Sequence, residues 1–106
     1  MEKHKPHYSL AEIKRAFSDA DNLGSMTGSA RNGIRALKLS DEDVVNVVQS
    51  LSKSDFRKSM TSQRDHTIWH DVYSPSYEEV ELYVKFTRDE ENKYYLLISF
   101  KQSDEQ

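Results

Sequence analysis

Two segments of alternating apolar and polar residues near the end of the 106-residue chain constrain its fold most strongly. A period of two is typical of a strand with one buried face and one solvent-exposed face. The stretch D-E-E-N-K separates the two segments, and Asn92 suits a left-handed turn position, so we expect an antiparallel hairpin. The apolar positions are Val80, Leu82, Val84 and Phe86 in the first strand, and Leu96, Ile98 and Phe100 in the second.

The pairing of these strands follows from their apolar pattern. The buried sets must meet on one face, because a slip of one residue would turn every side chain over. A three-residue loop between Asp89 and Lys93 meets this condition, and it places Tyr83 and Lys101 on the polar face, one diagonal apart. The expected pairs are Leu82 with Phe100, Val84 with Ile98, Tyr83 with Ser99, and Glu81 with Lys101.

Three helices are predicted ahead of the hairpin. Two of them begin at capping motifs, Ser9 with Glu12 and Ser40 with Asp43. The middle helix contains Gly33, which lowers its helix propensity. The apolar stripes are Leu10, Ile13 and Phe17; from a start near Ser29, Ala30, Ile34 and Leu37; and Val44, Val47, Val48 and Leu51.

The length and composition favour one α+β domain over residues 1–106, with N-terminal helices on one face of a small antiparallel sheet and a loose tail at 102–106. The chain has no cysteine, which excludes a disulfide framework and a cysteine-based zinc site. It also has no apolar leader segment and no run of 18 apolar residues. We therefore expect a cytoplasmic protein without a membrane segment.

The net charge of −3 argues against a protein that coats nucleic acid through phosphate neutralisation. Any anion-binding patch must therefore be local. The stretch SDFRKSMTSQRDHTIWHDVYSP, Ser54–Pro75, is one candidate, because it gathers cations and imidazoles around the chain's only tryptophan, Trp69. Its cationic and imidazole residues are Arg57, Lys58, Arg64, His66 and His70.

Metal chemistry does not fit this stretch. His66 and His70 are four residues apart, but Thr67 occupies the position where the helical zinc-protease motif needs Glu, and no third ligand lies within sequence reach. The glycines match no phosphate-binding loop, and no nucleophile elbow occurs. We predict neither a metal nor a cofactor.

Cleavage of RNA makes demands that these residue types meet. The reaction needs a base for the 2′-hydroxyl proton, cations for the phosphate, and an acid for the leaving oxygen. Lysine, arginine, histidine and tyrosine supply these groups without a metal, and aromatic rings stack on the bases of single-stranded RNA.

The strings S-D-F-R-K-S-M-T and D-H-T-I-W-H-D-V-Y-S-P closely resemble the most characteristic segment of the MqsR family of toxins from bacterial type II toxin–antitoxin systems. The opening M-E-K-H-K-P-H-Y-S-L-A-E-I-K and the closing L-L-I-S-F-K also resemble that family. The resemblance spans essentially the whole chain. It implies a RelE-like fold and a ribosome-independent, metal-independent mRNA interferase that cuts single-stranded mRNA at short GC-containing sequences by 2′-hydroxyl attack.

The resemblance also implies partners. The cognate antitoxin would be of the MqsA type, a zinc-containing protein with a helix-turn-helix half, and operator DNA would be contacted only through that antitoxin. A competing interpretation is a noncatalytic module of the same fold that binds the antitoxin and operator complex.

The resemblance assigns catalytic positions to Lys58, Tyr83 and Lys101. His70 stands where the family has a glutamine, so it either takes part in acid–base chemistry or only hydrogen-bonds the RNA. For RNA contact we consider a second set of residues, each of which has an ordinary structural alternative: Arg57, Arg64, His66 and Tyr73. We expect Trp69 in the core.

Overall fold

The computed structural model describes residues 1–103. In chain order the elements are β1 (Glu2–Lys3), α1 (Leu10–Ala16), β2 (Ser25–Met26), α2 (Gly28–Ala36), α3 (Asp41–Ser50), the 3₁₀ turn η1 (Lys53–Asp55), β3 (Phe56–Thr61), β4 (Trp69–Tyr73), β5 (Ser76–Tyr77), β6 (Val80–Asp89) and β7 (Tyr94–Gln102). No described helix is long and apolar enough to cross a membrane.

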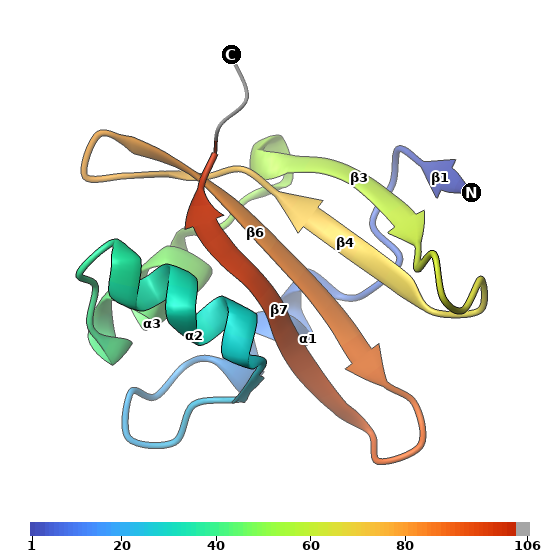
Figure 1. The fold of residues 1–106 in the computed structure, drawn as a ribbon, viewed down its shortest axis with the longest axis horizontal. Coiled ribbons are helices and arrows are strands. Elements are labelled where there is room, and N and C mark those ends of the chain that lie inside the picture. The colour runs from blue at the N-terminus through green and yellow to red at the C-terminus, as the bar shows by residue number, and fades with distance from the viewer. Residues whose placement is uncertain (104–106) are drawn as a thin grey trace.

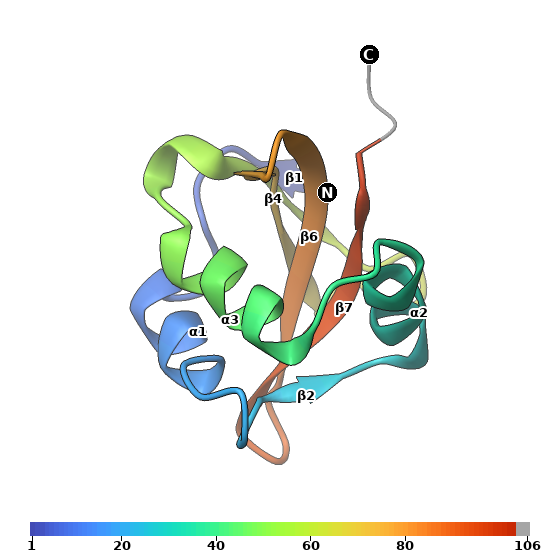
Figure 2. The same cartoon turned by 90° about the vertical axis from the view of Figure 1, so that its left-hand side faces the viewer.

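The strands form one mostly antiparallel sheet in the order β1-β3-β4-β6-β7-β2, and β5 adds to β6. Among the described strands, only β2 pairs in parallel, with β7. Helices α1 and α3 lie on one side of the sheet, and α2 lies beside β7 (Figures 1 and 2). The predicted α+β class, with helices ahead of an antiparallel sheet, is confirmed, although the sheet has more strands than the predicted hairpin.

The helix starts follow the predicted caps with one difference. At α3, Ser40 and Asp43 form a complete capping box. At α1, the Ser9 side chain accepts a hydrogen bond from the Glu12 backbone N–H at 3.2 Å. The Glu12 carboxylate, however, accepts a hydrogen bond from the Tyr95 hydroxyl at 2.7 Å, so this side chain ties α1 to β7 rather than closing a capping box.

The hairpin register differs from the prediction. Tyr83 lies directly opposite Lys101, and Val84 opposite Phe100, each two residues along β7 from the predicted partner. One residue of this difference arises because the ladder shifts between Lys85 and Phe86 and leaves Ile98 as an extra residue on β7, and the other arises at the turn. This bulge changes the alternation along β7, so that Leu97 and Phe100 are both buried. Apolar periodicity alone could not locate the bulge.

The turn and the chain end also differ from the predictions. Asp89 pairs with Tyr94, which makes the loop one residue longer than expected, and Lys93 rather than Asn92 takes the left-handed conformation, with φ of 60°. Strand β7 continues through Gln102, where a loose tail was predicted. In the rest of that predicted tail, the backbone N–H of Ser103 donates to the carbonyl oxygen of Glu81 at 2.8 Å, and residues 104–106 lie outside the described part of the chain.

Gly33 explains how α2 reaches the sheet. A Cβ atom at this position would lie 1.8 Å from the carbonyl oxygen of Phe100, so only glycine permits the helix backbone to approach β7 this closely. The residue that weakens α2 as an isolated helix is thus the one that allows it to pack.

Replacing Gly33 with alanine should therefore destabilise the protein, although alanine has the higher helix propensity. We expect Gly33→Ala to lower the free energy of unfolding in urea by about 1–3 kcal/mol, because the helix must move away from β7. Gly28→Ala is the matched control, since nothing lies within 4 Å of a Cβ placed there. An equal or higher stability for Gly33→Ala than for Gly28→Ala would contradict this account of the packing.

Candidate functional site

The side chains that point away from α1 and α3 form one surface, which we call the open sheet face. Its residues are Lys58 and Met60 on β3, His70 and Val72 on β4, Tyr83 and Lys85 on β6, and Ser99 and Lys101 on β7. Directly paired residues on neighbouring strands project to the same side, which fixes this set. In Figure 1 no helix crosses in front of β3, β4 and β6.

Tyr83 lies between two lysines on this face. The Nζ atom of Lys101 lies 5.3 Å from the centroid of the Tyr83 ring, and that of Lys85 lies 5.9 Å from it. Burial raises the pKa of the Tyr83 hydroxyl above its usual value, so the group is a proton-bearing hydrogen-bond donor at neutral pH. The predicted sharing of one face by Tyr83 and Lys101 is confirmed, at closer range than the diagonal expected.

Lys58 lies on strand β3, directly after a bulge at Arg57, and the sequence pattern did not indicate a strand here. It pairs with Val72 of β4, and its Nζ atom lies 3.7 Å from a carboxylate oxygen of Glu2. The strand was hard to recognise because its inward side chain Ser59 is polar. The hydroxyl of Ser59 donates to the buried carboxylate of Asp71 at 2.6 Å, so a hydrogen bond takes the place of an apolar contact.

His70 is half-buried on the same face. Its pKa is lowered chiefly by desolvation and further by the positive charge of Lys85, while Asp71 opposes the shift. Both main causes penalise the imidazolium form. His70 is therefore a neutral imidazole at pH 7, able to accept a proton or a hydrogen bond.

Lys85 is the charged member of this face that the sequence analysis did not select. Its pKa is lowered first by desolvation and then by the charges of Lys101 and Lys58. The signal was present in the sequence, since Lys85 alternates with Tyr83 on the polar side of the same strand. The sequence did not show that β4 lies next to β6 and β3 next to β4. This arrangement brings His70 and Lys58 onto the same face as Lys85.

The residues considered for RNA contact are not among those that define the open sheet face. Arg57 occupies a bulge in β3, where its guanidinium donates to the carbonyl oxygens of Ser54 at 3.0 Å and Ser74 at 3.4 Å. Arg64 and His66 are exposed in the loop between β3 and β4. The structure thus leaves their RNA contacts as predictions.

Tyr73, considered for RNA contact, takes instead the structural role that the sequence left open as its alternative. The residue is 0% exposed, and its ring packs against Phe56 and Phe86. Burial raises the pKa of its hydroxyl to about 12. Tyr73 is a core residue, and the sequence missed this because β4 turns the polar side chain of Asp71 inward and the apolar side chain of Val72 outward, which reverses the usual pattern. Trp69, which we expected in the core, is half-buried and packs against the edge of the hydrophobic core.

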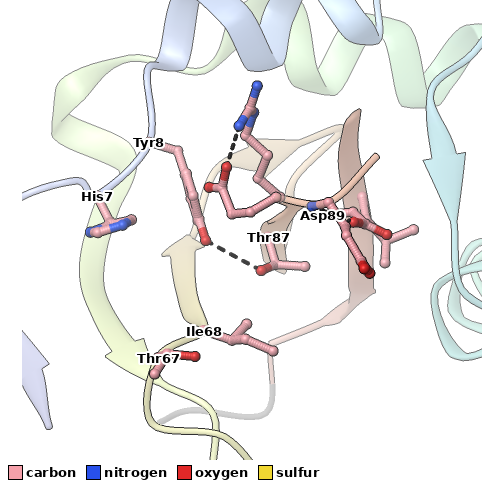
Figure 3. A pocket seen from close by; sticks show the side chains of 10 residues that line it. His7, Tyr8, Thr67, Ile68, Thr87 and Asp89 are labelled. Carbon is pink, nitrogen blue, oxygen red and sulfur yellow. Dashed lines mark hydrogen bonds and ion pairs between the residues drawn. The ribbon is translucent and has the colours of Figure 1, made fainter. Parts of the chain in front are cut away.

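A separate hollow of about 420 Å³ lies on the α1 side of the sheet, lined in part by His7, Tyr8, Thr67 and Ile68 (Figure 3). The Tyr8 hydroxyl points into it and lies 3.4 Å from the Thr87 hydroxyl. None of the predicted catalytic residues lines this hollow.

Among the described residues, no group of three histidines, cysteines or carboxylates is placed to hold a metal ion.

The fold and the open sheet face together define a small α+β protein with three lysines, a histidine and a tyrosine gathered on an uncovered sheet. A family described as "Motility quorum-sensing regulator, toxin of MqsA" matches residues 5–102. The chain is also 39% identical over 104 residues to the Escherichia coli (strain K12) protein named mRNA interferase toxin MqsR. The aligned region covers 96% of this chain and 99% of that relative. The chain belongs to the MqsR toxin family.

The electrostatic link between His70 and Lys85 has a direct test. We expect the Lys85→Met substitution to raise the pKa of His70 in an NMR titration of the imidazole resonances, because one positive charge that disfavours the imidazolium is removed. Lys5→Met removes the same charge from an exposed position near the N-terminus and should leave the midpoint unchanged. Identical His70 midpoints in wild type and Lys85→Met would show that the two side chains do not face each other.

Proposed function

We propose that this protein is an mRNA interferase toxin, a metal-independent and ribosome-independent endoribonuclease whose active site is the open sheet face. The observation that carries the proposal is the meeting of Lys58, His70, Tyr83 and Lys101 on one uncovered surface of a chain that belongs to the MqsR toxin family. These residues come from four different strands. The alternation of the hairpin accounts for Tyr83 and Lys101, but it gives no reason for Lys58 and His70 to join them.

The chemistry that we assign to this face is attack of an RNA 2′-hydroxyl on the adjacent phosphorus. The neutral imidazole of His70 takes the 2′-hydroxyl proton as the O2′–P bond forms and the P–O5′ bond breaks. The ammonium groups of Lys58 and Lys101 attract the phosphate, and the Tyr83 hydroxyl donates a hydrogen bond to a phosphate oxygen. The products are a 2′,3′-cyclic phosphate and a 5′-hydroxyl end.

The open geometry suits single-stranded RNA better than a duplex. A sheet face with no helix over it can contact one backbone and allow the bases to splay outward, as in other single-strand binders. We assign the cleavage to short GC-containing sequences in mRNA, as the family resemblance implies.

The family description names MqsA as the partner of these toxins. We propose a cognate antitoxin of that type, with a zinc site and a helix-turn-helix half, and contact with operator DNA only through it. Toxin and antitoxin would then meet in the cytoplasm, where the mRNA substrate is found.

The test is incubation of the purified protein with a defined mRNA in EDTA, followed by mapping of the new ends. We expect wild type to cut, and Tyr83→Phe and Lys58→Ala each to slow cleavage by about 100-fold or more, because they remove the donor and the phosphate charge. Tyr94→Phe, on an exposed tyrosine of the hairpin, and Lys5→Ala are matched controls that should cut at the wild-type rate.

Circular dichroism should show that all four variants keep the fold. Intact mRNA with wild-type protein, beside an active ribonuclease control, would support the noncatalytic interaction module instead. Wild-type rates for both Tyr83→Phe and Lys58→Ala would refute the assignment of the site.

A further inference from the structure

Lys85 lies at the centre of the open sheet face. Its direct neighbours across the strands are Val72 on β4 and Ser99 on β7. Tyr83 is two residues away on the same strand, and His70 is two residues from Val72, on the diagonal from Lys85. A phosphate bound in the middle of this face would therefore lie over Lys85.

Lys85 also interacts with each of the four residues to which we assign roles in cleavage. Its Nζ atom lies 5.9 Å from the centroid of the Tyr83 ring. Its positive charge disfavours the imidazolium form of His70 and lowers the pKa of that group. The charges of Lys101 and Lys58 act in turn on the ammonium of Lys85 and lower its pKa. No other lysine of the face has all of these relations in the described structure.

The surroundings of the three lysines differ in a way that matters for proton transfer. Lys58 pairs with the carboxylate of Glu2 at 3.7 Å, and Lys101 is exposed to solvent. Lys85 is half-buried, and among residues 1–103 it forms no ion pair. An ammonium that is partly desolvated, lacks a counterion and has two like charges nearby gives up its proton more readily than an ordinary surface lysine.

We propose that Lys85 is a catalytic residue, the general acid that protonates the 5′-oxygen leaving group. The inference rests on the proposed function. It assigns the proton transfer to the 5′-oxygen, for which the proposed function names no donor. As the O2′–P bond forms, the electron pair of the breaking P–O5′ bond goes to O5′, and the ammonium of Lys85 supplies the proton that makes the 5′-hydroxyl. Lys85 leaves the step as a neutral amine and regains a proton from water, while His70 returns its proton to water.

This role fits the physical requirements of the step. A general acid works best when its pKa lies near the operating pH. The pKa of an exposed lysine is too high for this role. The half-buried position of Lys85 between Lys58 and Lys101 lowers its pKa, which is the required direction. Arginine could not replace it, because a guanidinium does not release its proton in proteins.

The experiment compares two RNA substrates that carry the cleavage site mapped with the wild-type protein. One has the natural 5′-oxygen at the scissile phosphate, and the other has sulfur in its place. A sulfur leaving group departs as a thiolate and needs no proton, because a thiol is far more acidic than an alcohol. The second substrate therefore does not require a general acid.

We expect Lys85→Met and Lys85→Arg to slow single-turnover cleavage of the oxygen substrate by about 100-fold or more. On the sulfur substrate Lys85→Arg, which keeps the positive charge, should cut at nearly the wild-type rate. Lys5→Met is the control for loss of one charge and should match wild type on both substrates. Circular dichroism checks the fold, and Lys85→Arg carries the test if Lys85→Met does not fold.

Equal rates for wild type and both Lys85 variants on the oxygen substrate would overturn the inference. An equal slowing of Lys85→Arg on both substrates would also overturn it, because it would show that Lys85 acts through binding geometry rather than through its proton. These results differ from a failure of the proposed function, in which the wild-type protein itself would leave the all-oxygen RNA intact.

Discussion

The buried carboxylate of Asp71 is the interaction on which the rest of the structure depends. It is fully buried and accepts hydrogen bonds from the backbone N–H groups of His7 at 3.0 Å and Tyr8 at 2.9 Å, and from the Ser59 hydroxyl. A buried carboxylate is tolerated only when such donors replace water. This one group therefore fastens the segment before α1 to β4 and joins β4 to β3. Because Asp71 points inward, the alternation of the strand turns His70 outward.

The open sheet face follows from this arrangement. With the N-terminal segment and two helices packed on the Asp71 side, the other side of β3, β4 and β6 has no helix in front of it (Figure 1). The bulge at Ile98 then brings Tyr83 and Lys101 into direct register. The result is a set of lysines around a tyrosine and a neutral imidazole. These are the groups that metal-free phosphodiester cleavage requires.

The sequence predicted those features that depend on local pattern. The helix caps at Ser40 and Ser9 and the alternation of β6 are local, and the structure confirms them. The bulge at Ile98 and the inward polar pair of Ser59 with Asp71 depend on contacts between segments. Periodicity therefore gave the wrong register for the hairpin and did not indicate that β3 is a strand. For the same reason the sequence could not place Lys85 beside His70, or show that Tyr73 is buried.

The most direct test of the central claim is to map where RNA binds. An NMR titration would use an oligonucleotide that spans the cleavage site and has a 2′-deoxyribose there, so that it binds but cannot be cut. The account predicts that the largest shifts fall on β3, β4, β6 and β7 at Lys58, His70, Tyr83 and Lys101. Shifts confined to α1, or to the hollow lined by His7 and Ile68, would contradict it.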